Sequence, residues 1–465
     1  MTTASFSDSA SGLHVGSVHI LTPHDLAVSG GSIARLDGLA VFLDKGLPGE
    51  TLRCRITECK SRFARAEVLE TLKASPDAVS SFCTFADRCG GCAWTTLSYA
   101  AQLSWKEQQV RETLRRIGKV CFDQTEILPI TPSPRQTGYR NKMEFAFGYD
   151  GNEPAIGLRQ RNSHEIVPIT DCALCALPVK TILTVTRQWM RENSLAPYDG
   201  KNGYLRFLVV RCPNYTPDGK PRCLVECITA PGTRNMALAV ERLGRLLMET
   251  TATTGFIHSR RKARENVAYG EKTIVSMGEV TIQEQFGDLL LEAPAQAFLQ
   301  ANTDAASLLY KYIRDCIDIE RIRTVWDIYC GVGGIALSLA REGRKIRGIE
   351  TVDEAVGFAT KNARRVPGDC AFIQGDAGLK TMSLSPPPDV IVTDPPRAGL
   401  SPEVRDTILK LRPSRIIAVS CDPASLARDL AVLGAIYQVK SVKPIDLFPH
   451  TPHVEVVALL ALSKT

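Results

Sequence analysis

The last third of the chain alternates short apolar runs with amphipathic stretches, which is the pattern of a parallel sheet covered by helices. Apolar strands are predicted at 324–329, 345–349, 371–374, 390–393 and 416–419. Helices are predicted at 294–317, 335–341 and 402–411, another follows Glu350 up to Arg364, and a last strand at 454–462 closes the sheet. This order predicts a doubly wound α/β domain, which binds its ligands where the strands end.

The preceding residues have a different pattern. Between Gly30 and Leu72, apolar residues alternate with polar ones, with Gly and Pro turns between the runs, which predicts a small β-barrel of the OB type. A helix is predicted over 97–118, and strands follow, including a hairpin at Asp150-Gly151-Asn152. We therefore expect three domains: a barrel over 1–72, a central α+β domain over 73–292 and the α/β domain over 293–465. Residues 1–11 are expected to be disordered.

The predicted strand at 416–419 is followed by Ser420 and then by Cys421. Asp422 is predicted to cap a helix, with Pro423 at its first position. The positive end of that helix should favour the thiolate form of Cys421, which would make it a nucleophile. The alternative is that Cys421 is a small buried core residue, the commonest fate of a free cysteine.

Acidic residues follow the other predicted strands. The loop Asp327-Ile328-Tyr329-Cys330-Gly331-Val332-Gly333-Gly334 allows a cofactor to lie close to the backbone. Glu350 is placed to accept ribose hydroxyls, Asp376 to contact an adenine, and Asp394-Pro395-Pro396 to hold a base. No G-x-G-x-x-G pattern is present, so S-adenosylmethionine fits better than NAD. Each acid could instead cap a helix.

Cys83, Cys89 and Cys92 lie within ten residues, with a Gly pair between the last two. Convergent thiolates hold zinc or an iron–sulfur cluster, and the C-x5-C-x2-C spacing is not that of a zinc ribbon, so a cluster is favoured. Cys172 and Cys175 are the candidates for the fourth ligand.

Composition narrows the class of protein. The chain has 465 residues, a net charge of +6 and no apolar run long enough to span a bilayer, and its N-terminus lacks a signal-peptide core. Its 15 scattered cysteines predict reduced thiols in the cytoplasm. A basic face at Arg53, Arg55, Lys60, Arg62 and Arg65, and a basic stretch at 258–264, are compatible with RNA, although the barrel face is more simply a solvated surface.

Several motifs resemble those of the RNA 5-methyluridine methyltransferase family over nearly the whole chain. They are Gln300-Ala301-Asn302, Asp327–Gly333, Asp394-Pro395-Pro396-Arg397, Ser420-Cys421-Asp422-Pro423 and His453-Val454-Glu455. The resemblance implies a Rossmann-like class I S-adenosylmethionine-dependent methyltransferase domain, with Cys421 as nucleophile and Glu455 as base. It places Gln300, Tyr329, Glu350, Asp376 and Asp394 in the cofactor and uracil pocket.

The resemblance extends to the other domains. Cys83, Cys89, Cys92 and Cys172 match the ligands of a [4Fe–4S] cluster in the 23S ribosomal-RNA branch, and Cys175 lies outside that pattern. The barrel is similar to a TRAM domain, and Tyr139-Arg140-Asn141-Lys142 resembles a segment that lines the RNA path. Gly334 departs from the pattern, because some relatives have an Asn there near the cofactor.

These features predict methylation of uridine C5 in 23S rRNA, with RNA as the partner and neither a membrane nor an obligate protein partner. Two alternatives remain open: the same reaction on a tRNA uridine, and a non-catalytic iron–sulfur protein that binds RNA. A redox-active cluster of the radical type is disfavoured, because the run C-x3-C-x2-C is absent.

Overall fold

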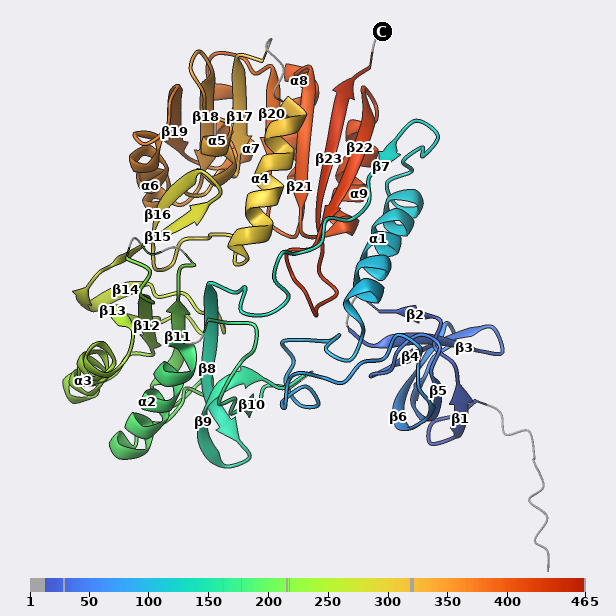
Figure 1. Cartoon of the computed structure of the whole chain (residues 1–465), viewed down its shortest axis with the longest axis vertical. Helices are drawn as coiled ribbons and strands as arrows, with labels where there is room; N and C mark the ends of the chain where they lie inside the picture. The colour runs from blue at the N-terminus through green and yellow to red at the C-terminus, as the bar shows by residue number, and fades with distance from the viewer. Residues whose placement is uncertain are drawn as a thin grey trace, which may run out of the picture. The chain divides into compact units, whose positions relative to one another are not determined.

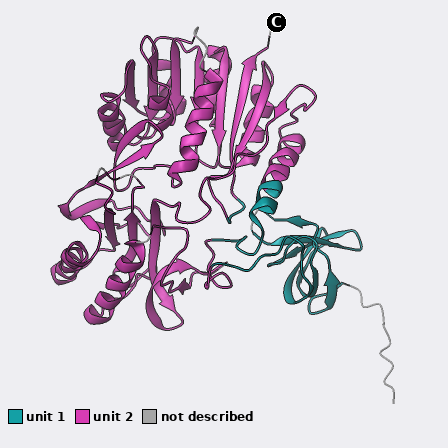
Figure 2. Cartoon of the chain, in the orientation of Figure 1, with its two compact units in different colours: residues 1–82, 92–105, 450–452 teal, residues 83–91, 106–449, 453–465 magenta. Residues whose placement is uncertain are grey.

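The computed structural model describes residues 13–27, 30–161, 163–176, 178–214, 216, 218–317 and 322–463 (Figure 1). The predicted disordered segment at 1–11 lies outside these ranges. The chain divides into two compact units, of which the first comprises residues 1–82, 92–105 and 450–452, and the second comprises the rest (Figure 2). Among the described residues, no helix combines the length and the apolar character that a membrane span requires.

The first unit contains a six-stranded sheet with the order β1-β5-β6-β4-β3-β2. Its strands are β1 (Val18–Leu21), β2 (Asp25–Leu26), β3 (Ser32–Leu36), β4 (Leu39–Leu43), β5 (Thr51–Cys59) and β6 (Phe63–Lys73). Leu52, Cys54 and Ile56 are buried, whereas the intervening Arg53 and Arg55 are exposed. The predicted alternation of apolar and basic residues is therefore confirmed for β5.

Most of the basic side chains on β5 and β6 have acidic neighbours. Arg53 pairs with Glu70, and Arg55 pairs with Glu67, at 2.7 and 2.8 Å. Lys60 and Arg65 both pair with Glu58. Since all these side chains are between about a third and two thirds exposed, the barrel face is a solvated, largely charge-paired surface.

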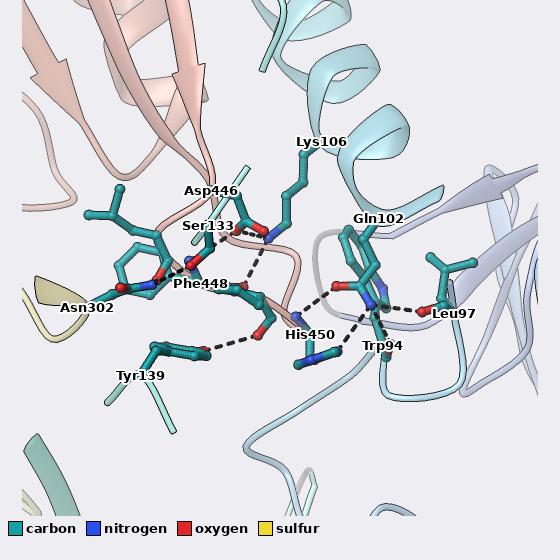
Figure 3. A network of polar contacts seen from close by, with 12 residues as sticks. Trp94, Leu97, Gln102, Lys106, Ser133, Tyr139, Asn302, Asp446, Phe448 and His450 are labelled. Carbon is teal, nitrogen blue, oxygen red and sulfur yellow. Dashed lines mark hydrogen bonds and ion pairs between the residues drawn. The ribbon is translucent and has the colours of Figure 1, made fainter. Parts of the chain in front are cut away.

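Residues 92–105 and 450–452 of the first unit are joined through the buried Gln102 of helix α1 (Tyr99–Arg116). The Gln102 amide donates to the Leu97 carbonyl at 2.8 Å and to the Trp94 carbonyl at 3.1 Å. Its oxygen accepts from the His450 backbone N–H at 2.8 Å (Figure 3). One amide thus satisfies buried backbone groups of two segments that are far apart in the sequence.

The central part of the second unit is a seven-stranded sheet with the order β10-β9-β8-β11-β12-β13-β14. Its strands are β8 (Lys142–Asp150), β9 (Glu153–Arg159), β10 (Ile166–Val167), β11 (Leu205–Arg211), β12 (Cys223–Thr229), β13 (Thr253–Arg260) and β14 (Lys272–Gly278). Helices α2 (Pro178–Asn193) and α3 (Arg234–Thr250) share one hydrophobic cluster with this sheet. The predicted hairpin is confirmed, because Asp150 pairs with Glu153 across a two-residue turn.

One expectation about the cysteines is wrong. Cys212 and Cys223, which lie next to β11 and β12, form a disulfide. Their Cα atoms are 4.6 Å apart because the antiparallel pairing of β11 and β12 brings the ends of these strands together. Spacing in the sequence did not indicate this pair, because the contact depends on sheet pairing.

The C-terminal part of the second unit has an eight-stranded sheet with the order β19-β18-β17-β20-β21-β23-β22-β7. Its strands are β7 (Glu126–Ile127), β17 (Thr324–Ile328), β18 (Lys345–Glu350), β19 (Asp369–Gln374), β20 (Val390–Thr393), β21 (Arg415–Ser420), β22 (Tyr437–Ile445) and β23 (Glu455–Leu462). The helices are α4 (Thr303–Ile317), α5 (Gly334–Ser338), α6 (Asp353–Ala363), α7 (Ala377–Lys380), the 3-10 turn η1 (Thr381–Ser383), α8 (Pro402–Leu411) and α9 (Pro423–Leu433).

Both faces of this sheet are buried. Val325 and Ile417 belong to the hydrophobic cluster that contains residues of α4 and α5. The adjacent residues Trp326 and Ile416 belong to the cluster that contains residues of α8 and α9. Since successive side chains of a strand point to opposite faces, helices cover both sides, as predicted for a doubly wound fold.

Two details of the predicted order are wrong. The helix expected from 294 begins at Thr303, because residues 289–294 form β16 (Leu289–Pro294), which pairs with β15 (Thr281–Phe286). The strand β23 does not close the sheet but lies antiparallel between β21 and β22. The division into domains at 72 and 292 stays a prediction.

A buried ion pair joins α1 to the segment after β22 within the second unit. Lys106 Nζ lies 2.6 Å from Asp446 Oδ1 and donates to the Phe448 carbonyl at 3.0 Å (Figure 3). Both side chains are fully buried, and burial lowers the pKa of Lys106 while Asp446 opposes that shift. Each charge therefore depends on the other for compensation.

We predict that Lys106→Met destabilises the second unit by about 3–5 kcal/mol, because it removes the buried ammonium group that compensates the charge of the Asp446 carboxylate. The double variant Lys106→Met/Asp446→Leu should lie within about 2 kcal/mol of the parent, since both buried charges are then removed together and apolar side chains take their place. Urea unfolding of the three proteins measures this. A double variant that is at least as unstable as Lys106→Met would contradict the account.

Candidate active site

Strand β21, Cys421 and helix α9 have the local structure that the sequence predicts. Asp422 caps α9, since its Oδ1 accepts from the Ala424 and Ser425 backbone N–H groups at 2.8 and 2.9 Å. Pro423 occupies the first position of the helix, where its missing N–H costs nothing. Cys421 is therefore held in a short link between a buried strand and a capped helix.

The expected preference of Cys421 for the thiolate form is wrong. Burial raises the pKa of the Cys421 thiol, and the carboxyl groups of Glu455 and Asp394 raise it further. Arg397 opposes this by its charge and by a hydrogen bond to the sulfur. The positive end of α9 lowers the pKa of Cys421 only weakly. Desolvation and the two nearby acids all raise this pKa, and together they outweigh the helix.

Glu455 and Asp394 form a desolvated pair of carboxyl groups. Glu455 is the first residue of β23 and is 2% exposed, and among the described residues its Oε1 has no hydrogen-bond partner. Burial raises the pKa of Glu455, and Asp394 raises it further. Burial also raises the pKa of Asp394, to about 6. Ionising one of these two carboxyl groups makes it harder to ionise the other, so their apparent pKa values belong to the pair and not to either residue alone.

The glycine loop after β17 has the open backbone that a close-lying cofactor requires. Gly331 and Gly333 have φ values of 54° and 92°, and a Cβ added to Gly331 would meet nothing within 4 Å. Tyr329 also has a positive φ of 73°, which is strained for a residue with a side chain. Glu350 fixes this loop, because its Oε2 accepts from the Gly331 N–H at 3.0 Å.

The other predicted cofactor residues lie around the same strand ends. Asp376 caps α7 by accepting from the Leu379 N–H at 3.2 Å, so the helix-cap alternative holds for this residue. Its charge also raises the pKa of the Tyr329 hydroxyl, although burial raises that pKa more. Gln300 is buried in the segment before α4, where its backbone carbonyl accepts from the Asn141 side chain at 3.0 Å.

Two of the predicted cluster cysteines, Cys83 and Cys172, act on the pKa of a third, Cys89, in the second unit. Burial raises the pKa of Cys89, and the thiols of Cys172 and Cys83 raise it further. Cys92 belongs to the first unit. Over the parts of the chain that the structure describes, no group of three or more His, Cys, Asp or Glu side chains is arranged to hold a metal ion.

The donor chemistry nevertheless suits a cluster. Thiolates are the usual ligands of iron–sulfur clusters, and Arg161 and Arg140 are near enough to lower the pKa values of Cys89 and Cys172, respectively. Positive charge of this kind would stabilise an anionic cluster. In this structure Cys172 is hydrogen-bonded to Cys175, whose Sγ donates to the Cys172 backbone carbonyl at 3.2 Å.

Two residues near the pair of acids have no predicted role in the sequence. Arg397 belongs to the motif Asp394-Pro395-Pro396-Arg397, which follows β20, and the pairing of β20 with β21 brings it near Cys421. Tyr310 of α4 is 6% exposed, and the carboxyl groups of Asp394, Asp327 and Glu455 raise its pKa in addition to burial. A Cβ added to Gly334 would lie 2.5 Å from the Tyr310 hydroxyl oxygen. Only the fold brings Tyr310 to this place.

Comparisons with known proteins agree with this arrangement. Residues 379–463 match the family described as tRNA (Uracil-5-)-methyltransferase, and residues 18–69 match the TRAM domain. A protein of Nitratidesulfovibrio vulgaris, named as an uncharacterized RNA methyltransferase, is 42% identical over 451 residues, which is 95% of each chain. One of Halalkalibacterium halodurans with the same description is 33% identical over 96% of this chain and 97% of its own.

A solved structure shares the fold. It is the Pyrococcus abyssi tRNA (uracil-54, C5)-methyltransferase in complex with S-adenosyl-L-homocysteine, with a TM-score of 0.75 and 24% identity, covering 95% of this chain and 100% of its own. The C-terminal part of the chain thus has the class I S-adenosylmethionine-dependent methyltransferase fold. The chain belongs to the tRNA (uracil-5-)-methyltransferase family of RNA methyltransferases, and it carries an N-terminal TRAM domain.

We predict that Glu455→Gln stabilises the folded protein at pH 8 by on the order of 1 kcal/mol, the usual scale of a single substitution, because the amide carries no buried charge. The pKa of Glu455 is higher in the folded protein than in the unfolded chain. The folded protein therefore becomes less stable as the pH rises from the unfolded-state pKa to the folded-state pKa. At pH 4 the gain should vanish. Thermal unfolding at both pH values measures this, with the exposed Glu153→Gln as control. A loss of stability at pH 8 would refute the assignment.

We predict that Arg397→Gln slows alkylation of Cys421 by iodoacetamide at pH 8 by about tenfold, the effect of raising the thiol pKa by one unit. The charge and the hydrogen bond of Arg397 are the groups that lower this pKa. Peptide mass spectrometry separates Cys421 from the other cysteines. Arg428→Gln on α9 is the matched control, and an unchanged rate in Arg397→Gln would show that Arg397 does not act on the sulfur.

Proposed function

We propose that the protein methylates C5 of a uridine in 23S rRNA, with Cys421 as nucleophile and Glu455 as base. The observation that carries the proposal is the meeting of one thiol and two carboxyl groups at a single edge of the sheet. Glu455 and Asp394 both act on the pKa of Cys421, which requires all three groups to be close. A nucleophile and a base so placed suit addition to a ring followed by proton removal.

The proposed chemistry explains why these residue types are needed. The Cys421 thiolate adds to C6 of uracil, and the electron pair of the C5–C6 bond moves into an enolate over C5, C4 and O4. C5 then attacks a methyl group that S-adenosylmethionine would supply when bound, and the bond from that methyl group to the sulfonium sulfur would break to leave a neutral thioether. The Glu455 carboxylate removes the hydrogen from C5, and the bond between C6 and sulfur breaks. The base is released as 5-methyluracil, and the thiolate is regenerated.

The raised pKa values fit these roles. A carboxyl group whose pKa is raised by burial is, once ionised, a stronger base than an ordinary surface carboxylate. Asp394 would hold the N3–H of the uracil. Arg397 would stabilise the thiolate before it adds to C6 and again after it leaves. The target base must leave its stack to reach this edge.

The cofactor residues of the proposal are Gln300, Tyr329, Glu350 and Asp376, together with Asp394 at the boundary with the uracil. The open space at Gly331 would admit a cofactor against the backbone. Glu350 retains unused lone pairs for ribose hydroxyls, although its oxygens already accept from Gly331 and Val352 N–H groups. Tyr310 would fill the space that a side chain at position 334 would take.

The choice of 23S rRNA rests on the resemblance of the cysteine set and the N-terminal barrel to the ribosomal-RNA branch. In the same proposal, Cys83, Cys89, Cys92 and Cys172 hold a [4Fe–4S] cluster of structural role, and the protein acts in the cytoplasm. The pKa of Cys89 responds to both Cys172 and Cys83, so these thiols lie near Cys89, which supports the cluster. The same reaction on a tRNA uridine is the alternative.

Incubation of unmodified 23S rRNA and of unmodified tRNA with the protein and labelled S-adenosylmethionine tests the substrate. We predict 5-methyluridine in the rRNA only, and none with Cys421→Ala, although that variant should still bind RNA. Label in tRNA alone would contradict the ribosomal assignment. Label that persists in Cys421→Ala would contradict the mechanism.

Anaerobic purification tests the cluster. We predict brown protein with about four iron atoms per chain, and loss of colour in Cys89→Ala. The matched control is Cys121→Ala, because Cys121 is exposed and lies outside the proposed ligand set. A colourless preparation loaded with zinc would contradict the cluster.

A further inference from the structure

A cavity lies in the central part of the second unit, and the residues that line it have no role in the proposed reaction. Its volume is about 430 Å³, within the range of small-molecule sites, and it lies between the β8–β9 hairpin and the loops at 198–200 and 264–266. Aromatic and basic side chains dominate its polar wall: Tyr149, Arg159, His164, Tyr198, Arg206 and Arg264.

Arg206 makes this wall rigid. It is 4% exposed, and its guanidinium lies 4.7 Å from the centre of the Tyr198 ring. The same guanidinium donates to the carbonyls of Ala263 and Glu265, at 2.6 Å in each case. The basic stretch at 258–264 is thus fixed beside the cavity by one buried arginine, so the site is formed before any ligand arrives.

The cavity keeps positive charge available for a ligand. Arg159 and Arg264 form no ion pair with any residue that the structure describes. Two acids, Glu165 and Asp199, also line the space. The Asp199 carboxylate already accepts from the Lys201 and Asn202 N–H groups, at 2.8 and 2.6 Å. The two arginines are therefore free to meet an anion, for which guanidinium groups suit a phosphate.

Another cavity lies next to this one. A neighbouring cavity of about 330 Å³ shares Ala146, Arg159 and Asn266 with it, and the side chains of Phe207 and Val267 line it. A polymer can occupy two adjacent spaces, whereas a single small molecule needs only one. Aromatic rings, guanidinium planes and phosphate-binding cations in one place are the features by which proteins hold unpaired RNA bases.

We propose that this cavity binds an unpaired nucleotide of the RNA, with its base against Tyr198 and its phosphate on Arg159 and Arg264. The proposal deepens the proposed function, on which it rests, because it places part of the substrate at a site separate from Cys421. It also gives the basic stretch at 258–264 a role, namely to form one wall of that site.

The test measures binding of a short, fluorescent, single-stranded oligouridine to the full-length protein by anisotropy over a range of salt concentrations. Tyr198→Ala should weaken binding by about 5-fold to 100-fold, the range for loss of one base–aromatic stack, and Tyr198→Phe should restore it. Arg264→Ala should weaken binding and reduce the slope of log Kd against log salt by about one, as for loss of one phosphate contact.

The matched control is Arg245→Ala, which removes an exposed arginine of α3 that is paired with Glu241 and does not line the cavity. Thermal unfolding establishes that each variant is folded. Wild-type affinity and salt dependence in all the cavity variants would overturn the proposal, as would tighter binding of an acidic phosphopeptide than of RNA.

Methylation assays separate this inference from the proposed function. Cys421→Ala should abolish 5-methyluridine formation and leave oligouridine binding unchanged, whereas Tyr198→Ala should weaken binding and raise the KM for RNA more than it lowers kcat. If the wild type makes no 5-methyluridine but the cavity variants still lose RNA affinity, the proposed function fails and the nucleotide site stands.

Discussion

The desolvation of two carboxyl groups beside a thiol is the constraint on which the candidate site depends. Parallel strands β20 and β21 end at the same edge of the sheet, and the antiparallel β23 begins there, so Asp394, Cys421 and Glu455 are necessarily close. Each group has little water to stabilise its charged form, and each raises the cost of charging the others. The fold thus raises the pKa of all three groups and disfavours the thiolate form of Cys421.

Arg397 is the group that opposes this constraint at the sulfur. It supplies a positive charge and a hydrogen bond to Cys421, and it also lies 3.4 Å from His453 Nε2. The pKa of His453 is lowered to about 4 by burial and by Arg397, so this imidazole is neutral near pH 7 and adds no charge. A bound RNA phosphate near this edge would further alter the balance, because the electrostatics of a desolvated site respond strongly to one charge.

The sequence predicts the elements whose signals are local. The cap at Asp422 and the hairpin at Gly151 follow from adjacent residues, and both were confirmed. The helix predicted over 294–317 begins only at Thr303, because residue 294 ends β16, whose pairing with β15 no local pattern encodes, and residues 295–302 lie between that strand and α4. The disulfide between Cys212 and Cys223, the raised thiol pKa of Cys421 and the position of Tyr310 over Gly334 all arise from contacts between distant segments, which no local pattern encodes.

The central claim is that the sulfur of Cys421 bonds to C6 of a uracil while a methyl group is added at C5. An RNA substrate in which the target uridine is replaced by 5-fluorouridine tests it most directly, because fluorine cannot be removed from C5 as a proton. In the presence of S-adenosylmethionine, mass spectrometry should find a stable, methylated RNA–protein adduct on the peptide that contains Cys421. An RNA that is bound and positioned but never trapped on that peptide, or is trapped on another residue, would contradict the account.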